Sequence, residues 1–584
     1  MKNDSIVAID FETYYDKEYS LKKLPISLYV KDKRFDPYLV SMASESVRYS
    51  GPLENAPWQQ ITGKTWIAHN ANFDLQVCER ATSLGLIPEW AKPKKWHCTA
   101  DLSVYRQAPR NLKGAAHTFL GMDLDKDVRD QMSCRQYRSL NKEEKTLWHN
   151  YAMGDSDAAL GIWNDQSSYW PESERRLSSQ TSRIGRKGVA VNTQLINWGI
   201  THLKTTLWEA EKLIPWADTE AKTLSAKALA EACRLEGIPA PASTAQNSPE
   251  CERWEERYGK EYPWVSAMRD YRKANKTLRV LETIKKRTSE DGIMPFSMKY
   301  CGAAATGRWS GDSGLNLQNL PRDESYGVNI RKCFIARPGK KFVISDLRQI
   351  EPIVLAWLIG DESFLAHVKA GRDTYEAHAR ASMNYTDPRP LKQVDKTLRS
   401  LAKARVLGLS YGASYEPFIR IAKQMAALEL NPVEAKRAVV DFRRSNPLIT
   451  GLWQRLDHAF KLSRNQTYTL ELPSGREVRY FDVSPRGWTA RVTQGQAPRR
   501  FWGSKLVENL IQAIARDVFG ECLLRLEDAG FDVVWHVHDE AIVEVDQHDK
   551  QALPEVVRLM SMAPDWAPGL PVSADAIEST HYTK

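Results

Sequence analysis

Acidic side chains gather at three points in the first third of the chain, and their spacing suits metal-ion chemistry. Asp10 and Glu12 end a strand-like run and, as alternate strand residues, point to the same face of a sheet. Asp74 closes the segment Asn-Ala-Asn-Phe-Asp, just after a second strand-like run. Tyr151 and Asp155 are four residues apart, so a helix places both side chains on one face.

Carboxylates carried by three elements can hold two divalent ions, which activate a water molecule and stabilise the leaving oxygen of a phosphodiester. Tyr151 can orient that water. Each pair alone is common on protein surfaces, so the hypothesis rests on all three in this order. The motifs D-x-E, N-x-x-F-D and Y-x-x-x-D resemble those of DEDD-type 3′→5′ exonuclease domains, the proofreading domains of many DNA polymerases. The resemblance implies two Mg²⁺ ions, with Mn²⁺ as an alternative, held by Asp10, Glu12, Asp74 and Asp155.

Two further acidic motifs lie in the second half of the chain. Asp346 ends a strand-like run and opens the segment Asp-Leu-Arg-Gln-Ile-Glu. Asp539 and Glu540 follow His538 at the tip of a predicted hairpin. A polar turn is the plain alternative for the His-Asp-Glu segment. Because Asp346 and Asp539 each end a strand, however, the two can share a pair of metal ions.

Between these motifs, four side chains recur every fourth residue and form one stripe on a predicted helix: Arg399, Lys403, Leu407 and Tyr411. A basic helix face in solvent is the common alternative. The functional interpretation is that the two cations bind a triphosphate and the far end of the stripe contacts a base. Lys403 can also protonate a pyrophosphate leaving group.

These motifs resemble those of family A DNA polymerases, the DNA polymerase I type. The family's D-Y-S-Q-I-E motif is matched by Asp346, Gln349, Ile350 and Glu351. Its R-x-x-x-K-x-x-x-F/Y-x-x-x-Y-G motif is matched by Arg399, Lys403, Tyr411 and Gly412, and its V-H-D-E motif is complete at 537–540. Further likeness lies at 306–310 (T-G-R-W-S), at 316–319 (N-L-Q-N) and in the Gln-bearing segment 508–513. The chain departs from the family at Leu347, Arg348, Pro352 and Leu407, where Leu407 replaces a usual aromatic residue.

The resemblance implies a DNA-templated DNA polymerase with proofreading. Asp346 and Asp539 would hold two Mg²⁺ ions with Glu540 in support, and Glu351 would contact the sugar and exclude a 2′-hydroxyl. The implied nucleotide-binding residues are Arg399, Lys403, Leu407, Tyr411, Glu351 and Gln349. The implied DNA-binding residues are Arg308, Gln318, Asn319, Gln512 and His538, of which Arg308 and Gln512 would touch the minor-groove edge of the terminal base pair.

The expected fold is a multidomain α/β protein, with an RNase H-like exonuclease domain followed by a right-hand polymerase. We predict an exonuclease at 1–170, a thumb at 171–295, a first part of the palm at 296–365, fingers at 366–499 and a second part of the palm at 500–584. No 5′-nuclease domain is expected before Asp10. This compact form resembles bacteriophage replicative enzymes more than bacterial repair enzymes.

Composition agrees with a folded, nucleic-acid-binding protein. With 584 residues the chain suits about three or four domains. The net charge of +9 favours an anionic partner, and 42% hydrophobic residues exclude a disordered chain. The eight Cys form no C-x-x-C pair, which argues against a zinc ribbon and fits a reducing compartment. Since the sequence shows no signal peptide and no long apolar run, we expect a soluble cytoplasmic protein with no membrane partner, in the host cytoplasm if the gene belongs to a phage.

A basic amphipathic helix is predicted over 268–287, in the middle of the expected thumb. Its cations Arg272, Lys273 and Lys276 are expected to track a DNA backbone, although a charged face in solvent is the common alternative. The expected partners are primer-template DNA and dNTPs, with a helicase, a primase or a single-strand-binding protein as further candidates. We expect a monomer.

Three alternative functions are a single-subunit RNA polymerase, a nuclease with a DNA-binding C-terminal half, and a non-catalytic DNA-binding scaffold. A single-subunit RNA polymerase shares the palm, but Glu351 and Glu540 argue against it, and rNTP against dNTP incorporation separates the two. A nuclease whose C-terminal half only binds DNA would not need Asp346, Lys403 and Asp539. A non-catalytic DNA-binding scaffold would need neither acidic set.

Overall fold

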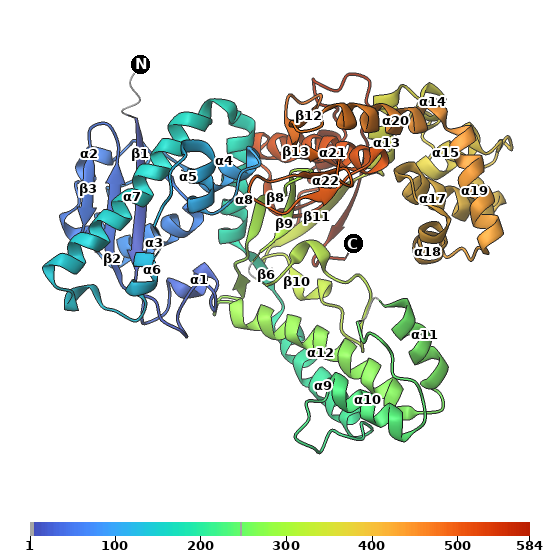
Figure 1. Cartoon of the computed structure of the whole chain (residues 1–584), viewed down its shortest axis with the longest axis horizontal. Helices are drawn as coiled ribbons and strands as arrows, with labels where there is room; N and C mark the ends of the chain where they lie inside the picture. The colour runs from blue at the N-terminus through green and yellow to red at the C-terminus, as the bar shows by residue number, and fades with distance from the viewer. Residues whose placement is uncertain (1–4, 126, 246–247, 313, 584) are drawn as a thin grey trace.

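The computed structural model describes residues 5–125, 127–245, 248–312 and 314–583. Figure 1 shows an N-terminal α/β domain at the left, a mixed domain in the centre, an all-helical domain at the right and a helical arm pointing down. Within the described residues, no helix is both long and apolar enough to cross a membrane. The predicted α/β multidomain class is confirmed.

The N-terminal domain is built on a five-stranded sheet with the order β3-β2-β1-β4-β5. β1 pairs antiparallel with β2 and parallel with β4, so the sheet is mixed, and it agrees with the expected RNase H-like arrangement. Its strands are β1 (Ile6–Thr13), β2 (Pro37–Ala43), β3 (Arg48–Gly51), β4 (Thr65–Ala68) and β5 (Lys95–Cys98). Its helices are α1 (Ile26–Tyr29), α2 (Trp58–Ile61), α3 (Ala71–Ser83), α4 (Thr99–Tyr105), α5 (Leu112–Leu120), α6 (Asp127–Met132) and α7 (Lys142–Gln166). Short 3₁₀ turns are η1 (Leu53–Asn55), η2 (Tyr137–Ser139) and η3 (Ser167–Tyr169).

The long helix α7 is the element that closes this domain. It begins at a capping box, in which the Asn141 side chain accepts from the Glu144 backbone and the Glu144 side chain accepts from the Asn141 backbone. The helix packs on β1 and β2, where the Ser41 hydroxyl contacts the Ala152 carbonyl at 2.8 Å and the Ser156 hydroxyl at 2.6 Å. These short side chains let the helix lie close to the sheet.

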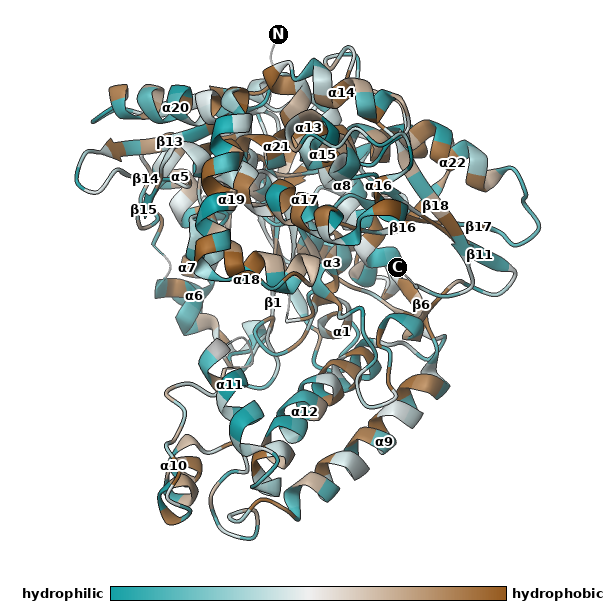
Figure 2. Cartoon of the chain, turned by 90° about the vertical axis from the view of Figure 1, so that its right-hand side faces the viewer, coloured by the Kyte–Doolittle hydropathy of each residue, from teal (hydrophilic) through white to brown (hydrophobic). Residues whose placement is uncertain are grey.

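A connecting helix and a helical arm follow. α8 (Glu172–Lys187) packs on β5 of the first domain and on β8, β16 and α21 of the central domain. The structure therefore places α8 between the two domains, and the arm expected as a thumb over 171–295 begins after it. The arm consists of α9 (Thr193–Glu211), α10 (Ala226–Leu235), α11 (Pro249–Tyr258) and α12 (Pro263–Arg287). The mixed hydropathy along α9 and α12 in Figure 2 is that of helices with one packed face.

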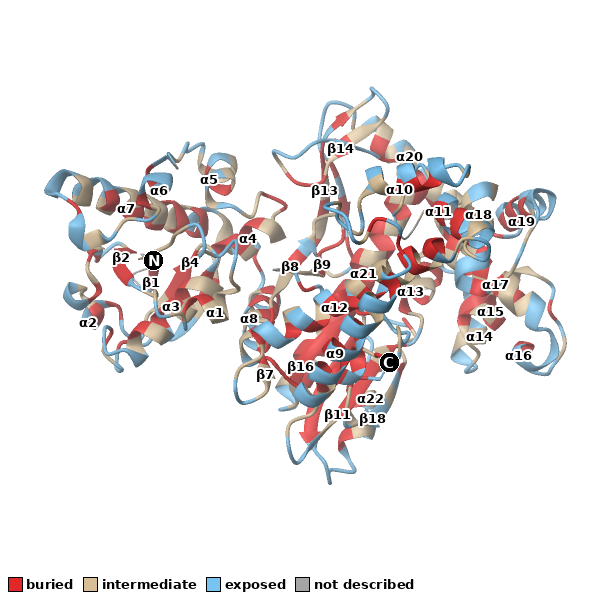
Figure 3. Ribbon diagram, turned by 90° about the horizontal axis from the view of Figure 1, so that it is seen from below, coloured by how far each residue is buried: buried red, intermediate tan, exposed pale blue. Residues whose placement is uncertain are grey.

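The central domain holds the sheet with the order β16-β17-β11-β18, all antiparallel. Its strands are β11 (Lys340–Leu347), β16 (Asp532–Val537), β17 (Glu540–Asp546) and β18 (Ala574–Ser579). The helices around it are α13 (Ile350–Ile359), α21 (Gly503–Asp528) and α22 (Ala552–Met560). Smaller strands are β6 (Val189–Val191), β7 (Ile293–Met294), β8 (Met298–Ala303), β9 (Arg308–Gly311) and β10 (Phe334–Ile335), with turns η4 (Leu317–Asn319) and η5 (Arg331–Cys333). Figure 3 shows that β11, β16 and much of α21 are buried, so the main core lies here.

The helical domain at the right is inserted between α13 and α21. Its helices are α14 (Glu362–Lys369), α15 (Thr374–Ser382), α16 (Leu391–Val394), α17 (Lys396–Gly408), α18 (Tyr415–Ala426), α19 (Pro432–Ser445) and α20 (Pro447–Leu462), with the turn η6 (Leu409–Tyr411). A small antiparallel sheet follows, made of β12 (Tyr468–Glu471), β13 (Glu477–Ser484), β14 (Thr489–Arg491) and β15 (Arg499–Arg500). This sheet reaches the N-terminal domain, since the Gln107 side chain donates to the Arg479 and Val492 carbonyls at 2.9 Å.

Candidate active sites

The structure brings three of the four predicted N-terminal carboxylates together. Asp10 and Glu12 project from β1, and Asp155 projects from α7 where that helix crosses the sheet. One carboxylate oxygen of each lies within 4.8 Å of the others. Carboxylate oxygens at this spacing are the ligand type that Mg²⁺ and Mn²⁺ prefer. The donor set therefore fits a divalent ion.

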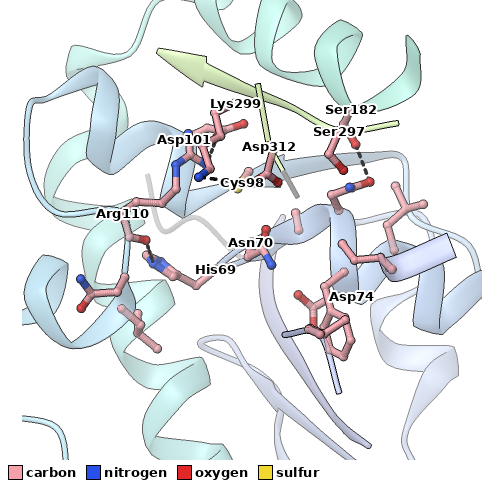
Figure 4. Close-up of a pocket in the computed structure, with 18 of the residues that line it drawn as sticks. His69, Asn70, Asp74, Cys98, Asp101, Arg110, Ser182, Ser297, Lys299 and Asp312 are labelled. Atoms are coloured by element: carbon pink, nitrogen blue, oxygen red, sulfur yellow. Dashed lines mark hydrogen bonds and ion pairs between the residues drawn. The ribbon is translucent and has the colours of Figure 1, made fainter. Parts of the chain in front are cut away.

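The fourth predicted ligand, Asp74, lies outside that group of three. It is only 1% exposed, on the first turn of α3, and accepts a hydrogen bond from the Phe11 backbone at 3.2 Å. Burial raises its pKa to about 8. Figure 4 shows Asp74 on the same side of the pocket as His69 and Asn70. A cation at the site would favour the ionised form of Asp74. In its position in the structure, however, the Asp74 carboxylate does not complete a four-carboxylate cluster.

Tyr151 and Arg129 face the same acidic group. Burial and the carboxylates of Asp155, Glu12 and Asp10 raise the pKa of the Tyr151 phenol. Burial lowers the pKa of Arg129, but the Tyr151 phenol and the neighbouring carboxylates outweigh it, so the net shift is upward. The Tyr15 hydroxyl also bonds the Arg129 carbonyl, which ties α6 to the end of β1. Sequence reasoning missed Arg129 because α6 carries no motif.

A cleft of about 2010 Å³ opens from these carboxylates toward the central domain. Across it from Asp74 lie Lys299 on β8 and Asp312 just after β9 (Figure 4). Basic side chains on its walls include Lys22, Lys113, Arg129, Arg175, Arg183 and Arg186. The lining is mixed, because acidic side chains such as Glu172 and Glu527 lie among these cations, and Glu527 already pairs with Arg183. The cleft reaches the central domain at β8 and Asp312.

The second acidic site is formed by two neighbouring strands of the central sheet. Asp346 near the end of β11 stands directly opposite Glu540 at the start of β17. The Asp539 carbonyl accepts from the Leu347 backbone at 3.1 Å, so the three carboxylates share one edge of the sheet. Burial raises the pKa of Asp539 to about 6 and that of Glu540 to about 7. The backbones of Asp346 and the hairpin tip therefore lie side by side, but among the described residues only the first site has three carboxylates with ligand oxygens within 4.8 Å of one another. A metal pair shared by Asp346 and Asp539 stays a prediction.

The hairpin tip is held by a side chain expected to bind DNA. His538 has a left-handed backbone, with φ 53°, which lets the chain turn between β16 and β17. The Gln318 amide donates to the His536 carbonyl at 2.8 Å and accepts from the His538 backbone at 2.9 Å. Because both ends of this buried amide are used, the structure gives Gln318 a positioning role. Contact between Gln318 and DNA stays a prediction, and Asn319 beside it is exposed.

Three predicted site residues form a chain of side-chain contacts next to the second acidic site. The Arg308 guanidinium pairs with Glu351 on α13, and the Tyr411 hydroxyl donates to the other Glu351 oxygen at 3.2 Å. Burial, followed by the Glu351 charge, raises the pKa of Tyr411. The chain runs from β9 through α13 to η6, so it links the central sheet to the helical domain. Gln512 lies on α21 and is half-buried.

The predicted cationic stripe lies on α17, but its first cation already has a partner. Arg399 contacts Asp373, the N-cap of α15, at 2.7 and 3.0 Å. Lys403 and Leu407 are half-buried on the same helix. Gln349 accepts from the Thr374 backbone at 3.0 Å, which fixes the start of α15 against α13.

The basic helix predicted over 268–287 lies within α12, and its three predicted cations differ. Its contact with a DNA backbone stays a prediction. Lys273 and Lys276 are exposed. Arg272 instead pairs with Glu255 on α11 and bonds the Thr244 carbonyl, with only 18% of its side chain exposed. The structure therefore assigns Arg272 to the packing of the arm, and its expected contact with a phosphate does not fit this geometry.

Comparison with known proteins identifies the polymerase part. Residues 210–581 match the family model described as DNA polymerase family A. The chain belongs to family A of the DNA polymerases. It therefore carries out DNA-templated DNA synthesis, and the predicted polymerase fold is confirmed. Following the predicted domain order, we call the central domain the palm, the helical domain the fingers and the arm the thumb.

Known relatives agree with this assignment. A DNA polymerase of Bacillus phage SP02 is 27% identical over 88% of this chain and 89% of its own length. The thermostable DNA polymerase I of Thermus aquaticus is 30% identical, over 44% of this chain and 28% of its own length. The POL domain of Pol1 from M. smegmatis, solved with a DNA primer-template and dNTP, matches 99% of this chain and 95% of its own with a TM-score of 0.71 at 17% identity.

Proposed function

We propose that this polymerase also removes nucleotides from the 3′ end of a primer, and that synthesis and removal use separate metal sites. One observation carries the proposal: two acidic groups lie on two different sheets, one at β1 and α7 and one at β11 and β17. Each contributes carboxylates at one end of its sheet, and a cleft lined by both basic and acidic side chains runs from the first toward the palm.

At the palm site, bound Mg²⁺ ions would activate the primer 3′-hydroxyl and stabilise the leaving pyrophosphate. Asp346 and Asp539 would hold them, with Glu540 beside Asp539. Lys403 would place its ammonium on the triphosphate and donate a proton to the leaving group. Arg399 would join it after exchanging Asp373 for a phosphate.

Around the nucleotide, Glu351 would lie against the sugar and exclude a 2′-hydroxyl. Its bonds to Arg308 and Tyr411 support this role, because they fix the carboxylate from two sides. Arg308 and Gln512 would contact the minor-groove edge of the terminal pair, which offers similar acceptors for every pair and so tests shape without reading sequence. A helicase, a primase or a single-strand-binding protein stays a prediction as a partner.

At the exonuclease site, bound Mg²⁺ or Mn²⁺ ions would supply the activated water. Asp10, Glu12 and Asp155 would hold them, and Asp74 would join as its carboxyl ionises. Tyr151 would orient the water, and Arg129 would stabilise the charge on the scissile phosphate. The basic side chains of the cleft would guide a frayed single strand from the palm.

The direct test of the palm assignment is primer extension with Mg²⁺ and all dNTPs by the wild-type chain and by Asp539→Asn. We expect extension by the wild type and none by the variant. In the same preparations, the wild type and Asp539→Asn should degrade a 3′-labelled single strand at equal rates. Extension by Asp539→Asn at the wild-type rate would remove this carboxylate from the mechanism.

A further inference from the structure

A tyrosine that follows the last strand of the palm reaches the polymerase site. Tyr582 is only 1% exposed, and its ring packs on Trp535 with the centroids 4.8 Å apart. Its backbone amide donates to the Phe334 carbonyl at 2.9 Å. From this fixed position its hydroxyl bonds the Oε1 atom of Glu540 at 2.8 Å. The side chain therefore spans the space between the palm core and a predicted catalytic carboxylate.

The direction of that hydrogen bond is settled by Arg331. Its Nη1 atom donates to the Tyr582 hydroxyl at 3.2 Å, and its guanidinium lies 5.0 Å from the Tyr582 ring centroid. Because a guanidinium can only donate, the hydroxyl oxygen accepts from Arg331 and its single proton points to Glu540. A hydroxyl group that accepts from a cation and donates to a carboxylate makes a strong, charge-assisted hydrogen bond.

Arg331 is itself held in place. Its Nη2 atom donates to the Leu320 carbonyl at 2.7 Å, and its Nε atom donates to the Pro321 carbonyl at 3.1 Å. These carbonyls follow η4, whose Gln318 holds the backbone of the hairpin tip. The segment 318–321 therefore acts at two points. Gln318 fixes the backbone of the hairpin tip, and the Leu320 and Pro321 carbonyls hold Arg331, which bonds Tyr582 next to the Glu540 side chain.

We propose that Tyr582 is a positioning residue for nucleotidyl transfer, which acts by fixing the rotamer of Glu540. With Oε1 bound to Tyr582, the Glu540 carboxylate is oriented where Asp346 stands opposite it and Asp539 precedes it. The proposal rests on the role given to Glu540 in the proposed function. The rival interpretation is that Tyr582 only packs the last segment of the chain against the palm.

Tyr582→Phe removes the hydroxyl and keeps the ring. The matched control is Tyr480→Phe, because Tyr480 is also fully buried and its hydroxyl accepts from Asn509 at 3.0 Å, while its strand β13 belongs to a different sheet from the hairpin of β16 and β17. We expect Tyr582→Phe to lower kcat by about tenfold, as for other residues that orient a metal ligand. KM for dNTP, the Kd for primer-template and the Tm should match those of Tyr480→Phe.

A binding measurement separates positioning from general damage. With a dideoxy-terminated primer and the next dNTP, no chemistry occurs, and the Mg²⁺ concentration that half-saturates the stable ternary complex can be read from a gel shift. We expect Tyr582→Phe to raise that concentration and Tyr480→Phe to leave it unchanged. Equal values for kcat and for this concentration in the two variants would overturn the proposal.

A double variant tests the route through Glu540. Tyr582→Phe combined with Glu540→Gln should lose no more kcat than Glu540→Gln alone, because the hydroxyl acts only through that carboxylate. If the two losses multiply, the proposal is overturned. If Glu540→Gln alone is fully active, the role of Glu540 in the proposed function is wrong. That result differs from the multiplied losses that would overturn the role of Tyr582.

Discussion

At the scale of single residues, Leu407 is the clearest departure from the family pattern. It stands four residues after Lys403 and four before Tyr411, on the stripe that we propose faces the nucleotide, and it is half-buried. Leu offers apolar contact but no flat face. A lost stacking surface is worth about 1–3 kcal/mol in single-strand binding, which is enough to alter nucleotide affinity.

We therefore expect Leu407→Phe to lower the apparent KM for dNTP, and Leu407→Tyr to raise dideoxynucleotide incorporation as well. The measurement is steady-state incorporation of dTTP and ddTTP. Leu398→Phe, half-buried on the same helix but off the stripe, is the control. A ddTTP/dTTP ratio that is the same in wild type and both Leu407 variants would show that Leu407 does not contact the nucleotide.

At the scale of elements, a buried ionic group clamps the loop before Arg308. Arg516 on α21 donates to the Gly307 carbonyl at 3.0 Å and pairs with Glu174 on α8 at 2.5 and 2.8 Å. Arg476 from the β12–β13 turn donates to the Thr306 carbonyl at 3.0 Å. Three separate elements thus fix the segment that leads into Arg308.

Breaking this group should be costly because a buried charge would lose its partner. We expect Arg516→Met to lower the free energy of unfolding by about 3–5 kcal/mol, measured by urea denaturation. Adding Glu174→Gln should restore part of that loss, since the second charge is then removed as well. A double variant as unstable as the sum of the two single variants would argue against a direct pair.

The thumb helix α12 gives a second prediction at this scale. Lys273→Gln with Lys276→Gln should weaken binding to all DNA sequences alike and reduce the slope of log K against log salt by about 2. Arg272→Gln should leave the slope unchanged and lower Tm instead, because Arg272 bonds within the thumb. An unchanged slope in the double Lys variant would mean that this face does not meet the DNA backbone.

Sequence reasoning succeeded where the chemistry depends on local spacing. The D-x-E pair on a strand, the hairpin tip and the first three residues of the stripe on α17 need only the period of one element. Tyr411, the fourth residue of the stripe, lies instead on the turn η6, because α17 ends at Gly408. The sequence alone could not predict three contacts: the pairing of Arg272 with Glu255, the hydrogen bonds of Gln318 to the hairpin backbone, and the hydrogen bond from Tyr582 to Glu540. Each of these depends on the packing of elements that are distant in sequence.

Asp74 illustrates the same limit within a predicted site. Its motif placed it correctly beside a strand, at the first turn of α3. How far the side chain lies from Asp10, Glu12 and Asp155 depends on how α3 packs against β1. There the Asp74 carboxylate accepts from the Phe11 backbone and lies outside the group of three. A sequence pattern names the ligands but does not set their distances.

For the whole molecule, we expect two activities that can be separated. The cleft at the N-terminal acidic site is not lined by Asp346, Asp539 or Glu540, and no described carboxylate belongs to both sites. A primer end would therefore pass from the palm to the N-terminal domain before hydrolysis. Substitutions at one site should leave chemistry at the other intact.

The decisive measurement is to assay both activities on two variants, each shown by its Tm to be folded. Asp10→Ala with Glu12→Ala should abolish 3′→5′ degradation of a labelled single strand and leave primer extension intact. Asp346→Ala should abolish extension and leave degradation intact. Loss of both activities in either folded variant would contradict two separate metal sites.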